Sequence, residues 1–315
     1  MAGQESNRVV IAALVGNALV ASTKLVAAVV TGSSAMMSEA VHTVVDTGNE
    51  LLLLHGLRRA ARPADADHPF GHGRELYFWS FVVALLVFAL GAGVSIYEGV
   101  SHVLHPVEIS RPVVNYVVLG LALLFEGSSW WVAFSAFRAG IGGLGYWEAV
   151  RRSKDPTTFT VLAEDTGAIL GILIAFAGTV AAVQLHRPVL DGVASIAIGV
   201  LLALVAIVLT RETKGLLIGE PARSELVSSI CQLAREHAGV ERSNGLFTVH
   251  LGPRQVVAAL SLEFEDTLTV GQVESIIADL EGQVRKLHPE VVSLLVKPQS
   301  SERPDFSLAP GADEG

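Results

Sequence analysis

Long apolar runs alternate with short polar segments over the first two thirds of the chain. Each run is about 20 residues long, which is enough for a helix to cross the hydrocarbon of a bilayer. The runs cover residues 9–30, 35–57, 77–100, 114–137, 159–185 and 189–209. The pattern predicts an α-helical membrane protein with six transmembrane helices, which form a transport domain over residues 1–210.

The pattern changes after residue 210. Helical periodicity over 224–237 and 270–287 is combined with alternating or apolar strand patterns over 246–251, 256–265 and 291–297. The order α-β-β-α-β predicts a small cytosolic α+β domain over residues 211–300, which we expect to dimerise. Residues 301–315 contain too few apolar side chains to order themselves, so we expect a disordered tail.

Composition supports the membrane class and excludes some partners. The chain is 51% hydrophobic and only 17% charged, with a mean hydropathy of +0.51. The formal net charge of -9 and the lack of a basic block argue against nucleic acid as a partner. Cys231 is the lone cysteine, so His, Asp and Glu are the available metal ligands.

Basic residues predict the orientation in the membrane. They cluster after the second, fourth and sixth runs, at Arg58, Arg59, Arg62, Arg74, Arg138, Arg151, Arg152, Lys154, Arg211 and Lys214, whereas the opposite connections carry Arg111 and Arg187. The positive-inside rule therefore places both termini in the cytoplasm. The short polar lead before residue 9 does not indicate a transit peptide, which favours a bacterial plasma membrane.

One face of the second run is polar. Glu39, His42, Asp46, Asn49 and Glu50 fall within about a 100° sector of a helix. A charged side chain at the centre of a bilayer costs about 2.5–3.5 kcal/mol, so these groups face one another or a bound ion. His42 and Asp46 lie one turn apart and offer the nitrogen and oxygen ligands that Zn²⁺ accepts. A hydrogen-bonded pair between helices is the alternative.

The fifth run offers two more carboxylates, Glu164 and Asp165, on a face whose small residues let another helix approach closely. If both meet His42 and Asp46, the set has the ligand count of a tetrahedral metal site. Protons would compete with the metal for these groups. Glu164 either ligates or caps the helix entry.

Two other features carry candidate chemistry. Lys24 in the first run is expected to pair with a buried carboxylate, Glu98 or Glu126. Between the second and third runs, His68 and His72, with Asp65 or Asp67, could hold a second metal in a cytoplasmic loop. A solvated turn held by glycines is the alternative for that loop.

Four segments together resemble the cation diffusion facilitator family of divalent-metal transporters. They are SSAMMSEAVHTVVD at 33–46, HPFGHGR at 68–74, YEG at 97–99 and DGVAS at 191–195. The resemblance covers nearly the whole chain. It implies a homodimeric transporter and not an enzyme. The implied activity is export of divalent cations from the cytosol in exchange for protons, with zinc as the favoured substrate.

The resemblance also implies site residues. In the family, the second helix gives two ligands, matched by His42 and Asp46, and the fifth helix gives another pair, of which only Asp165 is matched. Val161 stands at the first position of that pair and cannot ligate, so we expect Glu164 or a water as its replacement. A site richer in oxygen leaves manganese, iron or cobalt possible. Asp65, His68 and His72 coincide with positions that bind metal in some members.

Two rival functions remain open at the level of sequence. The altered fifth helix is compatible with a transport-inactive partner that senses metal or dimerises with an active transporter. A membrane-embedded, metal-dependent hydrolase would need a general base beside its metal, and Glu164 is the candidate for that role.

Overall fold

The computed structural model describes residues 2–141 and 154–300. The chain divides into two compact units, the first formed by Met1–Ala61 and Glu75–Lys214, the second by Arg62–Arg74 and Gly215–Gly315. The loop with the candidate second metal site therefore groups with the C-terminal residues, although the sequence suggested that it belongs to the helical domain. The expected tail, residues 301–315, lies outside the described residues, as do Arg151 and Arg152.

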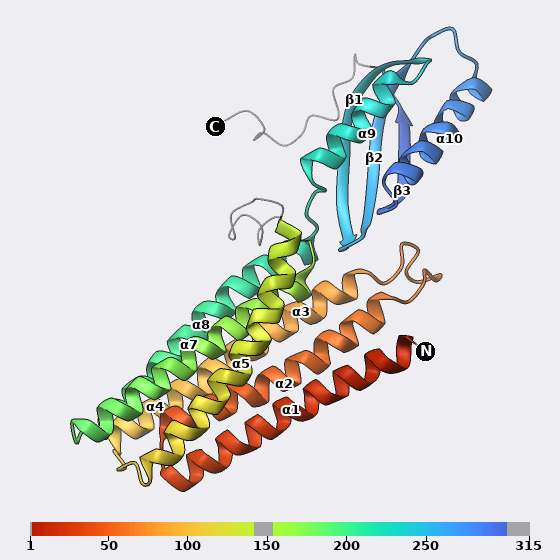
Figure 1. Ribbon diagram of the computed structural model, residues 1–315. Coiled ribbons are helices and arrows are strands. Elements are labelled where there is room, and N and C mark those ends of the chain that lie inside the picture. The colour runs from red at the N-terminus through yellow and green to blue at the C-terminus, as the bar shows by residue number, and fades with distance from the viewer. Residues whose placement is uncertain (1, 142–153, 301–315) are drawn as a thin grey trace. The chain divides into compact units, whose positions relative to one another are not determined.

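The first unit consists of long helices that run alongside one another (Figure 1). They are α1 (Ala2–Thr31), α2 (Ser34–Ala60), α3 (Arg74–Leu86), the π-helical turn η1 (Val87–Ala92), α4 (Gly93–Leu104), α5 (Pro112–Ile141), α7 (Pro156–Gln184) and α8 (Val189–Ile218). Since α3, η1 and α4 follow one another without a break, the described residues form six helical columns, one for each predicted run.

Four of these columns are long and apolar enough to cross a membrane: Arg74–Leu104, Pro112–Ser135, Phe159–Gln184 and Val189–Ile218. The described apolar part of α1, Gly16–Thr31, is shorter. The 27 residues of α2 are sufficient in length, but carboxylates at Glu39, Asp46 and Glu50 lower its hydropathy. Membrane crossing by α1 and α2 therefore stays a prediction.

The start of α2 is held by a carboxylate from α8. Asp191 is fully buried and accepts hydrogen bonds from Ser33 Oγ at 2.8 Å, from Ser34 N at 2.6 Å and from Ala35 N at 3.2 Å. The N–H groups in the first turn of a helix have no partners within the helix, and a negative charge there is favourable. Asp191 thereby fixes the first turn of α2 against α8.

Glycines bring α4 and α8 into close contact. A Cβ atom on Gly199 would lie 2.6 Å from Ile96 Cγ1 and 2.9 Å from the Ile96 nitrogen. A Cβ atom on Gly99 would lie 2.7 Å from the Ile196 nitrogen. Small residues at a helix crossing let two backbones approach, which is how helices gain packing energy in a bilayer.

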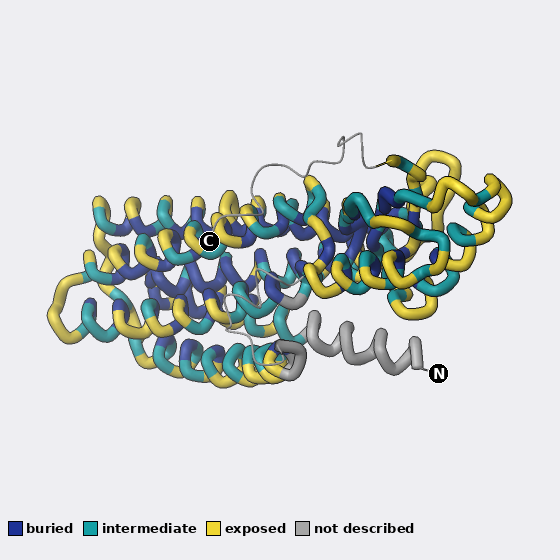
Figure 2. The backbone as a smooth tube through the Cα atoms, turned by 90° about the horizontal axis from the view of Figure 1, so that it is seen from above, coloured by how far each residue is buried: buried dark blue, intermediate teal, exposed yellow. Residues whose placement is uncertain are grey.

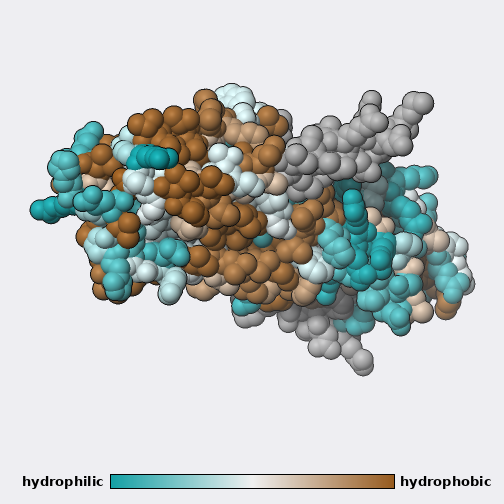
Figure 3. Space-filling view, turned by 90° about the horizontal axis from the view of Figure 1, so that it is seen from below, coloured by the Kyte–Doolittle hydropathy of each residue, from teal (hydrophilic) through white to brown (hydrophobic). Residues whose placement is uncertain are grey.

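The outer surface of the helical unit is apolar. Buried positions gather between the helices and exposed positions lie on their outer sides (Figure 2), and a broad hydrophobic surface covers the helices (Figure 3). Leu124, Val132 and Leu204 are 72%, 69% and 59% exposed. A contiguous apolar surface of this extent indicates contact with lipid.

The second unit contains α9 (Ser224–Glu236), β1 (Val240–Gly252), β2 (Gln255–Phe264), α10 (Val270–Leu287) and β3 (Val291–Pro298), in the predicted order. The strand order is β1-β2-β3, with β2 antiparallel to β1 and parallel to β3. Ile230 of α9, Leu260 and Leu262 of β2, and Leu280 and Val284 of α10 are buried in its core.

Several boundaries differ from the sequence prediction. Strand β1 begins at Val240 instead of residue 246, because backbone pairing with β2 carries the strand through polar residues that show no alternation. Helix α8 continues to Ile218, beyond residue 209, where the apolar run ends.

Replacement of Gly199 by alanine should weaken the helical unit. The added methyl group meets backbone atoms of α4, and overpacking of this kind typically costs about 1–3 kcal/mol. The thermal unfolding midpoint of the purified protein should therefore fall. Gly120→Ala is the matched control, since a Cβ atom there has nothing within 4 Å. Equal midpoints for the two variants would contradict the close contact of α4 and α8.

Candidate metal sites

Lys24 of α1 lies in a buried charge cluster with α2 and α5. Its Nζ atom lies 3.2 Å from Glu39 Oε2, 2.8 Å from Thr43 Oγ1 and 4.0 Å from Glu126 Oε1. Lys24 and Glu39 are fully buried. Among the described residues Lys24 therefore pairs first with Glu39 and second with Glu126, and the expected alternative, Glu98, is wrong.

His42 and Asp46 lie on the next turn of α2. His42 Nδ1 and Asp46 Oδ1 are 3.3 Å apart, and His42 is 1% exposed. Among the described residues, neither ring nitrogen of His42 has a hydrogen-bond partner, and neither does Asp46 Oδ1. Buried polar atoms are nearly always satisfied, so orphaned atoms of this kind indicate a missing ligand or water. A divalent cation would satisfy them.

Glu164 and Asp165 of α7 face different neighbours. Glu164 is 6% exposed and its Oε1 atom accepts a 2.7 Å hydrogen bond from Asn49 Nδ2 of α2. Asp165 Oδ2 accepts a 3.3 Å hydrogen bond from Ser129 of α5. The N-cap of α7 is Asp155, which accepts a hydrogen bond from the Thr157 nitrogen. Glu164 therefore does not cap the helix entry.

The four helix residues do not converge on one point in this conformation. The four candidate residues on the helices are His42, Asp46, Glu164 and Asp165. In the described part of the chain, no three of them have ligand atoms that all lie within 4.8 Å of one another. Val161 of α7 offers only an alkyl side chain, as its sequence position indicated. The Thr160 hydroxyl beside it is another buried oxygen without a partner in the described part of the chain.

The loop residues do converge. The ligand atoms of Asp65, His68 and His72 all lie within 4.8 Å of one another, so one cation could contact all three. Asp65 Oδ2 lies 3.0 Å from His72 Nε2, and Asp65 Oδ1 lies 3.2 Å from His68 Nδ1. The hydrogen bond from His72, followed by that from the His68 backbone, lowers the pKa of the Asp65 carboxyl to about 2.

The loop also forms the turn that was the alternative to a metal site, so the two interpretations are compatible. Asp65 Oδ1 accepts hydrogen bonds from the backbone nitrogens of Asp67 at 3.1 Å and His68 at 2.7 Å, as in an Asx turn. Gly71 has a φ of +82°, which favours glycine. The turn therefore places both oxygens of one carboxylate beside two imidazoles.

For two polar contacts on α2, the sequence did not predict which residues are paired. Asn49 donates to Glu164 and Asn17 of α1 donates to Glu50 Oε1 at 2.8 Å. The polar stripe contained Asn49 and Glu50, but periodicity shows only that residues share a face and not which neighbouring helix each one contacts.

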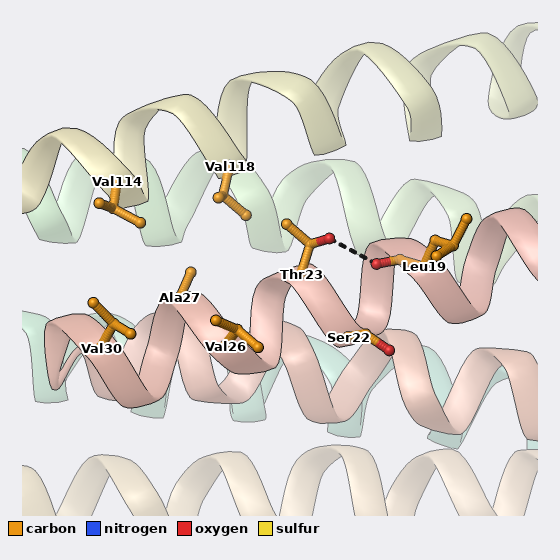
Figure 4. A pocket seen from close by; sticks show the side chains of 8 residues that line it. All are labelled: Leu19, Ser22, Thr23, Val26, Ala27, Val30, Val114 and Val118. Atoms are coloured by element: carbon orange, nitrogen blue, oxygen red, sulfur yellow. Dashed lines mark hydrogen bonds between the residues drawn. The ribbon is translucent and has the colours of Figure 1, made fainter.

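A groove between α1 and α5 is not suited to a cation. It has a volume of about 490 Å³ and is lined mainly by apolar side chains such as Leu19, Val26 and Val118 (Figure 4). Its two hydroxyl groups, on Ser22 and Thr23, donate to backbone oxygens of α1 at 2.7 and 2.8 Å. The residues that line this groove therefore offer a cation no charged ligand and only two hydroxyl oxygens.

Long apolar helices with ligand-type side chains between them, joined to a small α+β unit, define a polytopic membrane protein. Residues 10–218 match the cation efflux transmembrane domain. The chain therefore belongs to the cation diffusion facilitator family, which is a family of transporters.

Individual relatives agree with this assignment. A metal tolerance protein of Arabidopsis thaliana is 32% identical over 85% of this chain and 59% of its own length. A mitochondrial proton-coupled zinc antiporter of Homo sapiens is 31% identical over 82% of this chain and 46% of its own length. The cation-efflux pump FieF of Escherichia coli is 23% identical over 91% of this chain and 90% of its own length. The chain thus spans about half the length of the first two.

Removal of the Lys24 charge should destabilise the protein. Lys24→Met leaves the Glu39 carboxylate buried without its cation, and breaking a buried ion pair costs about 3–5 kcal/mol. Thermal unfolding in detergent measures the loss. Lys24→Met combined with Glu39→Gln should recover most of it, and Lys214→Met at an exposed position of α8 should have no effect. A stable Lys24→Met single variant would contradict the buried ion pair.

Zinc binding by the loop should depend on Asp65 and on pH. Asp65→Ala should weaken Zn²⁺ binding about tenfold or more in calorimetry of the purified protein, because the carboxylate contacts both imidazoles. Affinity should fall from about pH 8 to about pH 5 because imidazoles must be neutral to ligate, whereas Asp65 stays ionised throughout. Asp67→Ala is the control, and an equal loss in that variant would count against the loop site.

Proposed function

We propose that the protein exports divalent cations from the cytosol in exchange for protons, with zinc as the favoured substrate. The observation that carries the proposal is the pair of His42 and Asp46. His42 is buried, and its two ring nitrogens and the buried Oδ1 atom of Asp46 lack hydrogen-bond partners among the described residues. Imidazole and carboxylate together suit zinc and other borderline divalent metals.

The central site consists of His42 and Asp46 from α2 and Asp165 from α7. The fourth position, where Val161 offers no ligand atom, falls to Glu164 or a water. Because these groups do not converge in the present conformation, α2 and α7 must shift relative to each other when they close around the ion. Such a shift fits a transporter that alternates between inward-open and outward-open states.

Protons compete with the cation at this site. Each ligand must lose its proton to bind metal, so protonation of the imidazole and the carboxylates favours release. A proton gradient across the membrane thereby drives the cation in the opposite direction.

The membrane arrangement follows the distribution of basic residues. Both termini lie in the cytoplasm, so the loop with Asp65, His68 and His72 lies on the cytoplasmic side and binds a second cation there. The second unit joins two copies into a homodimer. A bacterial plasma membrane is the proposed location, in keeping with the match to the Escherichia coli pump over 90% of its length.

The relatives support this substrate and this mode of coupling. The human relative is named a proton-coupled zinc antiporter and the bacterial one a cation-efflux pump. Since Val161 removes one expected ligand, manganese, iron and cobalt remain alternative substrates.

The second candidate function is a transport-inactive partner that senses metal or dimerises with an active transporter, and Val161 is the observation that favours it. Intact His42 and Asp46 argue against it, because a buried unpaired carboxylate is costly to keep. The hydrolase reading has less support, since Asn49 already occupies the carboxylate of its candidate base, Glu164.

Flux measurements test the proposed function. The full chain is reconstituted into liposomes that contain a metal-sensing dye, and a pH gradient is imposed. We expect gradient-dependent Zn²⁺ flux in the wild type and none in Asp46→Ala or Asp165→Asn, because each variant loses a charged ligand. Glu98→Gln removes a carboxylate of α4 that lies outside the proposed site and should retain the flux.

Each result separates the hypotheses. Undiminished flux in either ligand variant would reject the assignment of the site. A wild type that moves no divalent metal under any gradient would reject transport and favour the partner function.

A further inference from the structure

Among the described residues, only one of the two polar atoms of the Asn49 amide has a hydrogen-bond partner. The residue is fully buried in α2. Its Nδ2 atom donates a 2.7 Å hydrogen bond to Glu164 Oε1 of α7, whereas its Oδ1 atom has no partner among the described residues. A buried amide oxygen without a donor is uncommon, so a group outside the chain itself is expected to satisfy it.

In the structure the NH₂ group of the Asn49 amide faces Glu164 of α7. This orientation suits an ionised Glu164, because an ionised carboxylate only accepts hydrogen bonds. Rotation of the amide by half a turn would place two acceptor oxygens against each other. The orphaned atom of Asn49 is therefore the oxygen, which is a metal ligand, and not the nitrogen, which is not one.

The orphaned oxygen shares a face of α2 with the proposed central site. Asn49 follows Asp46 by three residues and Asp46 follows His42 by four, and residues at these spacings are neighbours on a helix surface. The His42 ring nitrogens, Asp46 Oδ1 and Asn49 Oδ1 are all buried and all lack hydrogen-bond partners in the described part of the chain, although His42 Nδ1 and Asp46 Oδ1 lie 3.3 Å apart. A cation between these side chains would satisfy them together.

We propose that Asn49 Oδ1 is a direct ligand of the transported cation, in place of the ligand atom that Val161 cannot supply. This inference rests on the proposed function. Glu164 is then a positioning residue, because its carboxylate holds the Asn49 NH₂ group and turns the amide oxygen toward the ion. The site offers one imidazole nitrogen, two Asp carboxylates and one neutral amide oxygen, a set that favours harder divalent cations more than a set with two imidazoles does.

Cobalt spectroscopy on the full chain tests direct ligation. Co²⁺ is titrated into purified protein that carries Asp65→Ala, His68→Ala and His72→Ala, so that the loop does not contribute to the d–d bands. Asn49→Leu should lower the Co²⁺ affinity about tenfold or more and change the band positions, because a ligand oxygen is lost. Asn49→Asp, which keeps an oxygen at this position, should retain binding.

A double variant separates ligation from mere support of Glu164. Glu164→Gln keeps an oxygen that can accept from the Asn49 NH₂ group, so the amide stays held in this background. If Asn49 ligates the ion, Asn49→Leu should therefore cause about the same tenfold loss in the Glu164→Gln background as it does alone. If Asn49 acts only through Glu164, the second substitution adds nothing, and the inference is overturned.

Asn17→Leu is the matched control for loss of an Asn–Glu hydrogen bond between helices, since Asn17 donates to Glu50 at 2.8 Å. It should leave the Co²⁺ affinity unchanged, and so should Thr160→Val, which removes another buried oxygen without a hydrogen-bond partner among the described residues. An equal loss in either variant would overturn the special role of Asn49. Far-UV circular dichroism checks that every variant is folded.

The flux assay keeps this inference apart from the proposed function. Wild-type flux that Asp46→Ala abolishes, together with unchanged Co²⁺ affinity in Asn49→Leu, overturns the role of Asn49 alone. Absence of wild-type flux overturns transport, whereas a tenfold affinity loss in Asn49→Leu would still establish the ligand.

Discussion

Charged groups between apolar helices need partners, and this requirement determines how α2 is placed in the helical unit. Hydrocarbon offers no hydrogen bonds, so each polar group must be satisfied by protein or by an ion. Glu39 is matched by Lys24 of α1, Glu50 by Asn17 of α1, and Asn49 by Glu164 of α7. With Asp191 at its first turn, these contacts fix both the rotation and the register of α2.

The same requirement identifies the functional part of α2 by what it leaves unmatched. Glu39 and Asn49, on the turns before and after His42 and Asp46, are each paired with a neighbouring helix through one polar atom. Each also keeps one buried oxygen without a hydrogen-bond partner among the described residues, as do the His42 ring nitrogens and Asp46 Oδ1 between them. The proposed guest is a cation, because these oxygens and one nitrogen of a neutral imidazole are Lewis bases.

Periodicity in the sequence predicted the helical columns and the α-β-β-α-β unit, because both depend on local patterns of apolar side chains. It also placed Glu39, His42 and Asp46 on one face. It failed for the pairing of Lys24 with Glu39, because the contact between two helices depends on their relative rotation. The π-helical turn η1 carries no pattern that distinguishes it from the α-helix on either side. The loop ligands were found through spacing and resemblance, and their convergence depends on a turn around Asp65.

Charge balance connects the Lys24 pair with the proposed exchange. Lys24 is a permanent part of the chain, and its positive charge compensates the negative charge of Glu39. Among the described ion pairs, none joins Asp46 or Asp165 of the proposed site to a lysine or an arginine. Asp46 pairs with His42, which carries a positive charge only when it is protonated. A dication that leaves a low-dielectric interior exposes these carboxylates to mutual repulsion. Protons are the available replacement, because they neutralise a carboxylate without needing a coordination sphere. Exchange of metal for protons is thus the path on which no intermediate holds several uncompensated charges.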